Sequence, residues 1–152
     1  MPNDRFDIYV RWVYRLAIAV SLFTGIGNMP MWGRFFVADI PGFGWSGNFF
    51  INMYVHYLSG ALLLTISSYY IFLYSQRSDK RIKISAPGVV RGALLGLVLI
   101  SGLLSAIKNL AFVDLPLTGL MALVFLHLGS AMAFIFFALV FWLRKKPWMI
   151  TS

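Results

Sequence analysis

Two histidines are the residues of this chain whose type and surroundings best suit chemistry, and the sequence contains only these two. His56 stands in the apolar stretch NMYVHYLSGALLL, and His127 stands in LVFLHLGSAMAFIFF. The absence of cysteine excludes disulfides, iron–sulfur clusters, thiolate zinc sites and cysteine nucleophiles. Any redox or metal chemistry must therefore depend on the two imidazoles or on a group that is packed without a covalent bond.

The composition indicates the solvent in which these histidines work. Of the 152 residues, 60% are hydrophobic and 12% are charged, against about 45–50% and about 25% in soluble domains. This excess predicts a membrane protein without a substantial soluble domain. The net charge of +8 does not indicate nucleic-acid binding, because the basic residues gather at the ends of the apolar runs.

Four apolar stretches are long enough to cross a bilayer, since a spanning helix needs about 20 residues. We predict helices over residues 8–29, 49–74, 89–107 and 117–143. No internal repeat and no low-complexity linker is evident. We therefore expect an all-α integral membrane protein, a four-transmembrane-helix bundle that forms a single membrane domain over 1–152.

The basic residues predict the orientation of the four helices. Eleven of the thirteen lie before or at the start of the first helix, around the second connection, or after the fourth helix. The positive-inside rule then places the N and C termini in the cytoplasm. The connection over about 30–48 would lie on the outer face, where its aromatic residues favour a surface loop, a short interfacial helix or a footprint for a partner.

The depths of the two histidines are similar in this arrangement. His56 lies 21 residues before Arg77, and His127 lies 17 residues before Arg144. At 1.5 Å per residue, these separations are about 31 and 25 Å from the inner basic boundary. Helix tilt can absorb a mismatch of roughly 6 Å.

Ionisable residues at membrane depth are costly and are functional hypotheses by default. Two imidazoles at matched depth on two helices favour bis-histidine ligation of one b-type haem, His56 and His127 being the axial ligands of its iron. A proton relay and plain interhelical packing are the alternatives. A divalent metal site is disfavoured, because the second, third and fourth helices carry no carboxylate.

Small and apolar neighbours suit a flat macrocycle. Gly60 and Gly129 would leave room for it. Four larger side chains could supply apolar walls: Met53, Phe125, Met132 and Phe134.

Three stretches resemble the b-type cytochrome subunit of formate dehydrogenases (the gamma subunit) and of membrane-bound nickel–iron hydrogenases. They are RWVYRLAIAVSLFTGI, VHYLSGALLL and LHLGSAMAFIFFALVFW. Members of that family typically hold two haems stacked across the membrane. The resemblance maps the outer pair of ligands onto His56 and His127.

The inner pair of ligands is missing. The family's first-helix histidine precedes a tryptophan, and here Arg11 precedes Trp12. The deeper fourth-helix histidine would fall near Val140 and Phe141. The resemblance thus implies a single-haem variant that keeps the outer haem b.

The function that the resemblance implies is electron transfer in a respiratory oxidoreductase complex. The chain would pass electrons between an iron–sulfur or catalytic partner subunit and the quinone pool, menaquinone or ubiquinone, in a bacterial or archaeal cytoplasmic (inner) membrane. It would be an electron-transfer subunit rather than the catalytic one. The alternative function is a haem-free anchor that docks a soluble enzyme to the bilayer, and a small transporter or channel has little support.

Two further groups of residues are candidates for contacts with ligands. Arg34 and Lys108, the outer-face basic residues, could pair with haem propionates or could simply be solvated. Arg11, Tyr14 and Arg15 could contact a quinone, or the arginines could reach the inner-leaflet phosphates.

Overall fold

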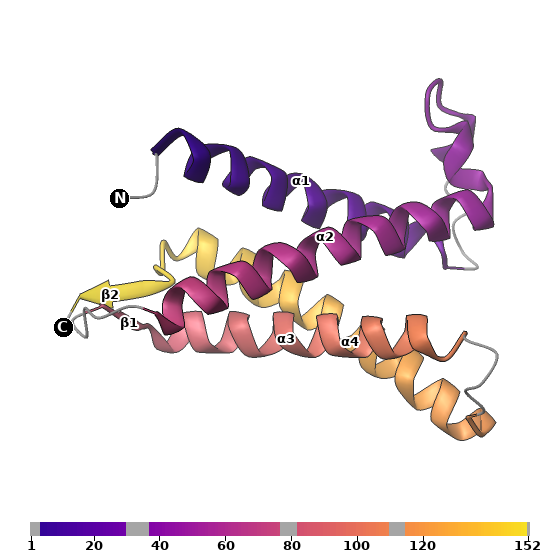
Figure 1. Cartoon of the computed structure of the whole chain (residues 1–152). Coiled ribbons are helices and arrows are strands. Elements are labelled where there is room, and N and C mark those ends of the chain that lie inside the picture. The colour runs from indigo at the N-terminus through magenta and orange to yellow at the C-terminus, as the bar shows by residue number, and fades with distance from the viewer. Residues whose placement is uncertain (1–3, 30–36, 77–81, 110–114, 152) are drawn as a thin grey trace. The chain divides into compact units, whose positions relative to one another are not determined.

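The computed structural model describes residues 4–29, 37–76, 82–109 and 115–151 (Figure 1). These residues form four α-helices with short 3₁₀ and β elements between and after them. The helices are α1 (Asp4–Gly27), α2 (Phe49–Ser75), α3 (Ala86–Ile107) and α4 (Leu117–Leu143). All four are long and apolar enough to cross a membrane, with the span of α1 beginning at Ile8.

The helix bounds lie within a few residues of the predicted spans. The predicted first residues differ most for two helices. α1 begins at Asp4 rather than at 8, and α3 begins at Ala86 rather than at 89. Ser85 explains this earlier start, because its hydroxyl accepts a hydrogen bond from the Gly88 amide at 3.0 Å and caps the helix. Pro87 in the first turn has no amide hydrogen that would need a partner there.

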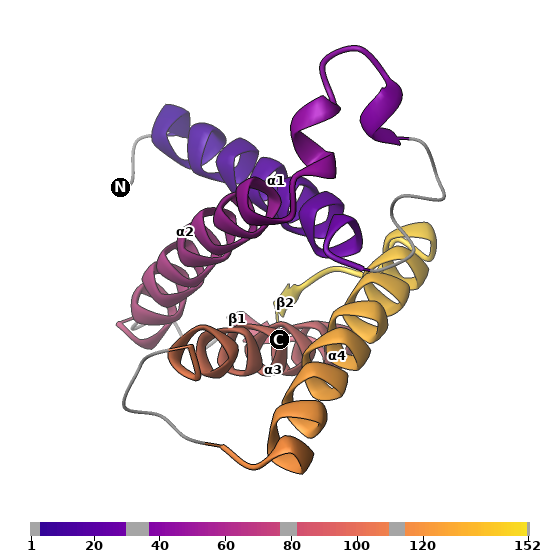
Figure 2. The same ribbon diagram turned by 90° about the vertical axis from the view of Figure 1, so that its right-hand side faces the viewer.

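The chain divides into two compact units, Met1–Ser75 and Gln76–Ser152. Each unit is built on one helical hairpin, α1 with α2 and α3 with α4 (Figure 2). The orientation of the termini and the expected packing of four helices into one bundle stay predictions.

In the first hairpin, polar side chains join the two helices. Asn52 is fully buried and donates to the Thr24 carbonyl at 2.9 Å and to Asn28 Oδ1 at 3.0 Å. Ser21 donates to the Ser59 hydroxyl at 2.7 Å. Such bonds suit helices in lipid, where apolar side chains gain little by leaving one apolar medium for another.

The connection between α1 and α2 holds two short 3₁₀ helices, η2 (Val37–Asp39) and η3 (Gly44–Gly47). The Phe23 ring on α1 packs against Phe43 and Trp45, with ring centroids 5.5 and 5.8 Å apart. Short helical turns were one of the expectations for this connection. Its first part, residues 30–36, lies outside the described residues.

The second unit contains an antiparallel strand pair that the sequence did not predict. β1 (Ile82–Ile84) pairs with β2 (Met149–Thr151), with Lys83 opposite Ile150. The Ser85 amide donates to the Trp148 carbonyl at 3.0 Å, and the Ser85 hydroxyl donates to the Pro147 carbonyl at 2.6 Å. The chain after α4 is thereby held against the start of α3.

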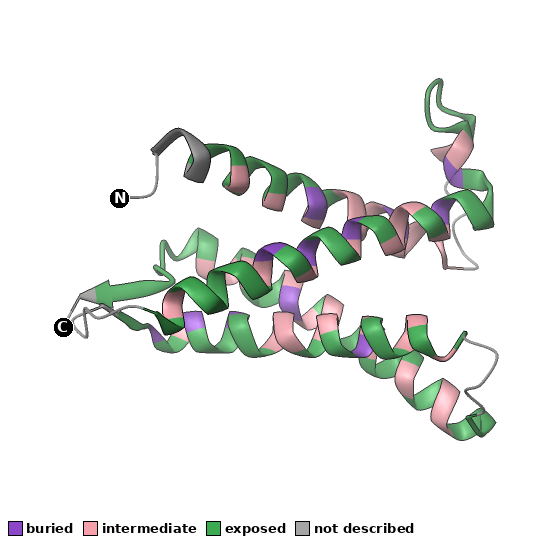
Figure 3. Cartoon of the chain, viewed as in Figure 1, coloured by how far each residue is buried: buried purple, intermediate pink, exposed green. Residues whose placement is uncertain are grey.

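Burial follows the pattern of a membrane protein rather than that of a soluble one (Figure 3). Large apolar side chains cover the outside, Leu58 being 74% and Phe125 70% exposed. The residues with the lowest exposure are mostly small and polar, and include Thr24, Ser46, Asn52 and Ser101. An apolar exterior around a polar helix interface is stable only in an apolar solvent.

Candidate functional site

His56 lies on α2 with its ring against α1. The Thr24 hydroxyl lies 2.7 Å from the Val20 carbonyl, one turn earlier, and 3.0 Å from His56 Nδ1. Because a hydroxyl has a single proton and a carbonyl can only accept, Thr24 donates to Val20 and accepts from Nδ1–H. Thr24 is fully buried, so this contact lies inside the hairpin.

His127 lies on α4 with its ring against α3, in the same type of environment. The Ser101 hydroxyl donates to the Leu97 carbonyl at 2.7 Å and lies 3.1 Å from His127 Nδ1. The Val98 carbonyl also lies 3.1 Å from Nδ1. Since this carbonyl can only accept, the hydrogen-bond network assigns the proton of the neutral ring to Nδ1.

The two rings therefore share one tautomer, with the proton on Nδ1 and the lone pair on Nε2. This is the form in which a neutral imidazole binds a metal through Nε2 while its other nitrogen donates to a protein group. The arrangement suits metal ligation.

A glycine faces each ring from the neighbouring helix. A methyl group added at Gly25 would lie 3.2 Å from His56 Cε1, and one added at Gly102 would lie 3.0 Å from His127 Cε1. Both distances are shorter than the usual carbon–carbon contact of about 3.5–4.0 Å. An alanine at either position would therefore crowd the ring, which would have to shift by a few tenths of an ångström.

The glycines predicted to pack against a haem differ in position. Gly60 follows His56 by one turn and shares its face, and no atom lies within 4 Å of an added Cβ there. Gly129 is also open, but it follows His127 by two residues and so lies roughly 200° around the helix. Ala131 occupies the position in α4 that corresponds to Gly60 in α2.

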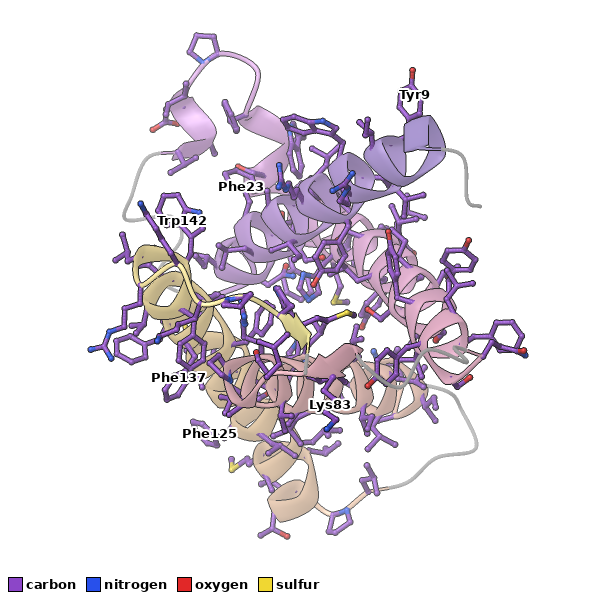
Figure 4. All side chains as sticks on the ribbon, turned by 90° about the vertical axis from the view of Figure 1, so that its left-hand side faces the viewer. Tyr9, Phe23, Lys83, Phe125, Phe137 and Trp142 are labelled. Atoms are coloured by element: carbon purple, nitrogen blue, oxygen red, sulfur yellow. The ribbon has the colours of Figure 1, made fainter. Side chains whose placement is uncertain are left out.

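The predicted apolar wall residues lie in different environments. Phe134 is buried, Met53 is half-buried, and Met132 is 54% exposed. Phe125 lies on the outer surface of α4, as does Trp142 nearer its end (Figure 4).

The basic candidates that the structure describes lie in the first half of α1 and directly after α3. Lys108 follows α3 directly and is half-exposed, whereas Arg34 lies outside the described residues. Arg11 and Arg15 are exposed on α1, and Tyr14 is half-buried. The Arg15 guanidinium lies over the Trp12 ring, 5.4 Å from its centroid.

The end of α4 around Phe141 holds an aromatic and cationic cluster. The Arg91 guanidinium lies 5.5 Å from the Phe141 ring centroid and 4.3 Å from that of Trp148. It also donates to the carbonyls of Lys146 and Pro147 at 3.1 and 3.0 Å. In the second unit, Arg91 contacts the Phe141 ring and holds the chain after α4 through these bonds and the Trp148 ring.

Sequence reasoning identified the histidines but not their hydroxyl partners, Thr24 on α1 and Ser101 on α3. A serine or threonine followed by glycine occurs on both first helices of the hairpins, as Thr24-Gly25 and Ser101-Gly102. The first pair was noticed only as part of a family pattern, and the second was overlooked. Arg91 was interpreted as a boundary charge, although it is only 5% exposed.

Within the described residues, no three histidine or carboxylate side chains gather to hold a metal ion. No protein-family model, no curated protein and no solved structure matches this chain.

Proposed function

We propose that this chain is a single-haem cytochrome b subunit of a membrane oxidoreductase complex. His56 and His127 would hold the haem iron through their imidazole nitrogens. It exchanges electrons between a partner subunit and a quinone dissolved in the bilayer.

The observation that carries this proposal is that Nδ1 of each histidine lies within hydrogen-bond distance of an oxygen on the neighbouring helix, which favours the same tautomer at both. Each Nδ1–H is directed at an acceptor on the neighbouring helix, at 3.0 Å for His56 and 3.1 Å for His127. A histidine that serves packing alone has no need of the same tautomer at two sites, whereas an axial ligand must present Nε2.

The chemistry of the donors fits the group. Two neutral imidazoles are a common ligand pair for b-type haem, and the sequence contains no cysteine thiolate that could take the place of either. Bound there, haem would supply one-electron transfer at iron, which no side chain of the protein can provide alone.

The chain's own residues have three tasks in this function. The histidines hold the iron, and their hydroxyl partners keep the rings oriented. The apolar helix surfaces keep water and competing reactions away from the site. The four candidate membrane spans keep the site within the layer where a quinone diffuses.

The missing second pair of ligands bears on the electron path. Arg11 stands at one of the two lost positions, and Phe141 lies beside Arg91 near the other. Electrons must then pass from the single haem to a quinone bound closer to it, or through another subunit of the complex.

Optical spectra of purified alanine variants test the proposal. The protein is purified with whatever binds to it, and is reduced with dithionite. We expect a sharp alpha band that is lost in His56→Ala and in His127→Ala, because each variant leaves one axial position without a protein ligand. Leu58→Ala and Leu128→Ala are matched controls, because these exposed leucines lie close to the histidines in α2 and α4.

A band that survives both histidine substitutions would overturn the ligand assignment. A colourless protein from haem-replete cells that still brings its partner enzyme to the membrane would instead support the haem-free anchor.

A further inference from the structure

The two hairpins share a local arrangement that extends beyond the histidines. In each, a hydroxyl on the first helix bonds to the carbonyl four residues earlier, Thr24 to Val20 and Ser101 to Leu97, both at 2.7 Å. In each, the same hydroxyl oxygen lies 3.0 or 3.1 Å from a histidine Nδ1 on the second helix. The residue that follows is glycine in both, and its added Cβ would meet the ring at Cε1.

A third feature repeats on the second helices. Ser59 donates to the His56 carbonyl at 3.0 Å, and Ser130 donates to the His127 carbonyl at 3.0 Å. Both serines follow their histidine by three residues and are buried. Each hairpin therefore combines serine or threonine followed by glycine on one helix with His-x-x-Ser on the next.

The correspondence holds without insertions within the helices. Only the connection differs in length, since 32 residues separate Thr24 from His56 and 26 separate Ser101 from His127. The matched residues keep their spacing on each helix, while the loop between them does not. Conserved helical spacing with a variable loop is what two copies of one supersecondary unit would retain.

We propose that the chain carries two copies of one histidine-presenting hairpin, with Thr24 and Ser101 as positioning residues. Each hydroxyl, whose own proton is donated to a backbone carbonyl, accepts Nδ1–H and so leaves the lone pair of the neutral ring on Nε2. Gly25 and Gly102 provide the space in which the rings lie. The effect on iron rests on the function proposed above, whereas the repeat and the tautomer do not.

One further contact of His127 bears on its strength as a ligand. The Val98 carbonyl gives His127 a second acceptor for Nδ1–H. A carbonyl partner makes an imidazole a stronger ligand. His127 therefore keeps an acceptor for Nδ1–H when the Ser101 hydroxyl is removed.

The experiment removes each hydroxyl and then exchanges the two residue types. Thr24→Val and Ser101→Ala remove the acceptor, while Thr24→Ser and Ser101→Thr place in each hairpin the residue that the other already uses. Thr65→Val is the matched control, because Thr65 bonds the Ala61 carbonyl at 2.9 Å from an exposed position on α2.

The first measurement needs no haem. Nitrogen-15 spectra of the full chain, labelled at histidine and prepared in lipid from haem-depleted cells, identify the tautomer of each ring. We expect Nδ1–H for both rings in the wild type and a change at His56 alone in Thr24→Val, so that His127 is the internal reference. An Nε2–H tautomer in the wild type, or spectra that are unchanged by Thr24→Val, would overturn the proposal.

The second measurement uses the haem-loaded complex. Partners that orient a metal-bound histidine typically contribute 10- to 100-fold in metal affinity. We expect Thr24→Val to weaken haem retention by about that factor and to shift the midpoint potential, with a smaller effect in Ser101→Ala. The exchanged variants and Thr65→Val should match the wild type. Exchanged variants that behave like Thr24→Val would refute the equivalence of the hairpins.

The two measurements separate the two proposals. A wild type that never takes up haem but shows both Nδ1–H tautomers would sink the proposed function and leave the repeat standing. A haem-loaded wild type whose haem retention and midpoint potential do not change in any of the four variants would support the proposed function and overturn the role of Thr24 and Ser101.

Discussion

The glycines beside the two rings allow a quantitative test of how each histidine is seated. In Gly102→Ala the new methyl group would lie 3.0 Å from His127 Cε1 and 3.4 Å from Nδ1. Relieving this contact requires the ring to move by a few tenths of an ångström. The same displacement would lengthen the 3.1 Å bonds that Nδ1 makes to Ser101 and Val98.

Crowding of a packed interior by one methyl group costs about 1–3 kcal/mol. If the ring moves, this cost appears as weaker haem binding, about 5- to 150-fold at 1.4 kcal/mol per factor of ten. Gly25→Ala should be milder, because its methyl group would lie 3.2 Å from His56 Cε1.

The assay is the rate at which haem is lost from the purified, reconstituted protein to an excess of a haem-binding acceptor. Gly96→Ala is the control on the same helix as Gly102, since no atom lies within 4 Å of an added Cβ there. Alanine also favours a helix over glycine by about 1 kcal/mol, so the control should be as stable as the wild type or slightly more stable. Equal rates of haem loss in Gly102→Ala and Gly96→Ala would refute the seating of His127 by this glycine.

Two further predictions concern the hairpins themselves. Asn52→Ala removes both hydrogen bonds that a fully buried amide makes to the first helix and the residue after it. We expect the first hairpin to be less stable by about 0.6–1.7 kcal/mol, as for interhelical hydrogen bonds in membranes. Thermal unfolding in detergent measures this loss, and an unchanged midpoint would contradict it. Arg91→Met removes two charged hydrogen bonds and the contact with the Trp148 ring, worth about 3 kcal/mol together. Amide exchange over β2 should therefore become faster by on the order of 100-fold, whereas Arg144→Met, at an exposed position, should leave it unchanged.

The helices were predictable because their apolar runs are long and carry few charges. α4 has no charged residue between Leu117 and Leu143, and its predicted bounds are those of the structure. The pairing of β1 with β2 was not predictable, since each strand has three residues and its partner lies at the far end of the second unit. The contacts of Arg91 were not predictable for a related reason, because the Lys146 and Pro147 carbonyls and the Trp148 ring belong to residues after α4.

The candidate site was predictable in part. The histidines stood out because no Lys, Arg, Asp or Glu interrupts the two helices that carry them, and Thr24-Gly25 belonged to a pattern with a family resemblance. Ser101 did not stand out, because small residues are common at any transmembrane helix interface. The repeat became visible only when the contacts of both imidazoles could be compared side by side.

The amount of haem per chain in the purified wild-type protein tests the central claim most directly. We predict one haem b per chain, with a reduced spectrum that disappears when His56 and His127 are both replaced by alanine. A ratio of zero from haem-replete cells, a ratio of two, or haem retained by the double variant would contradict the claim.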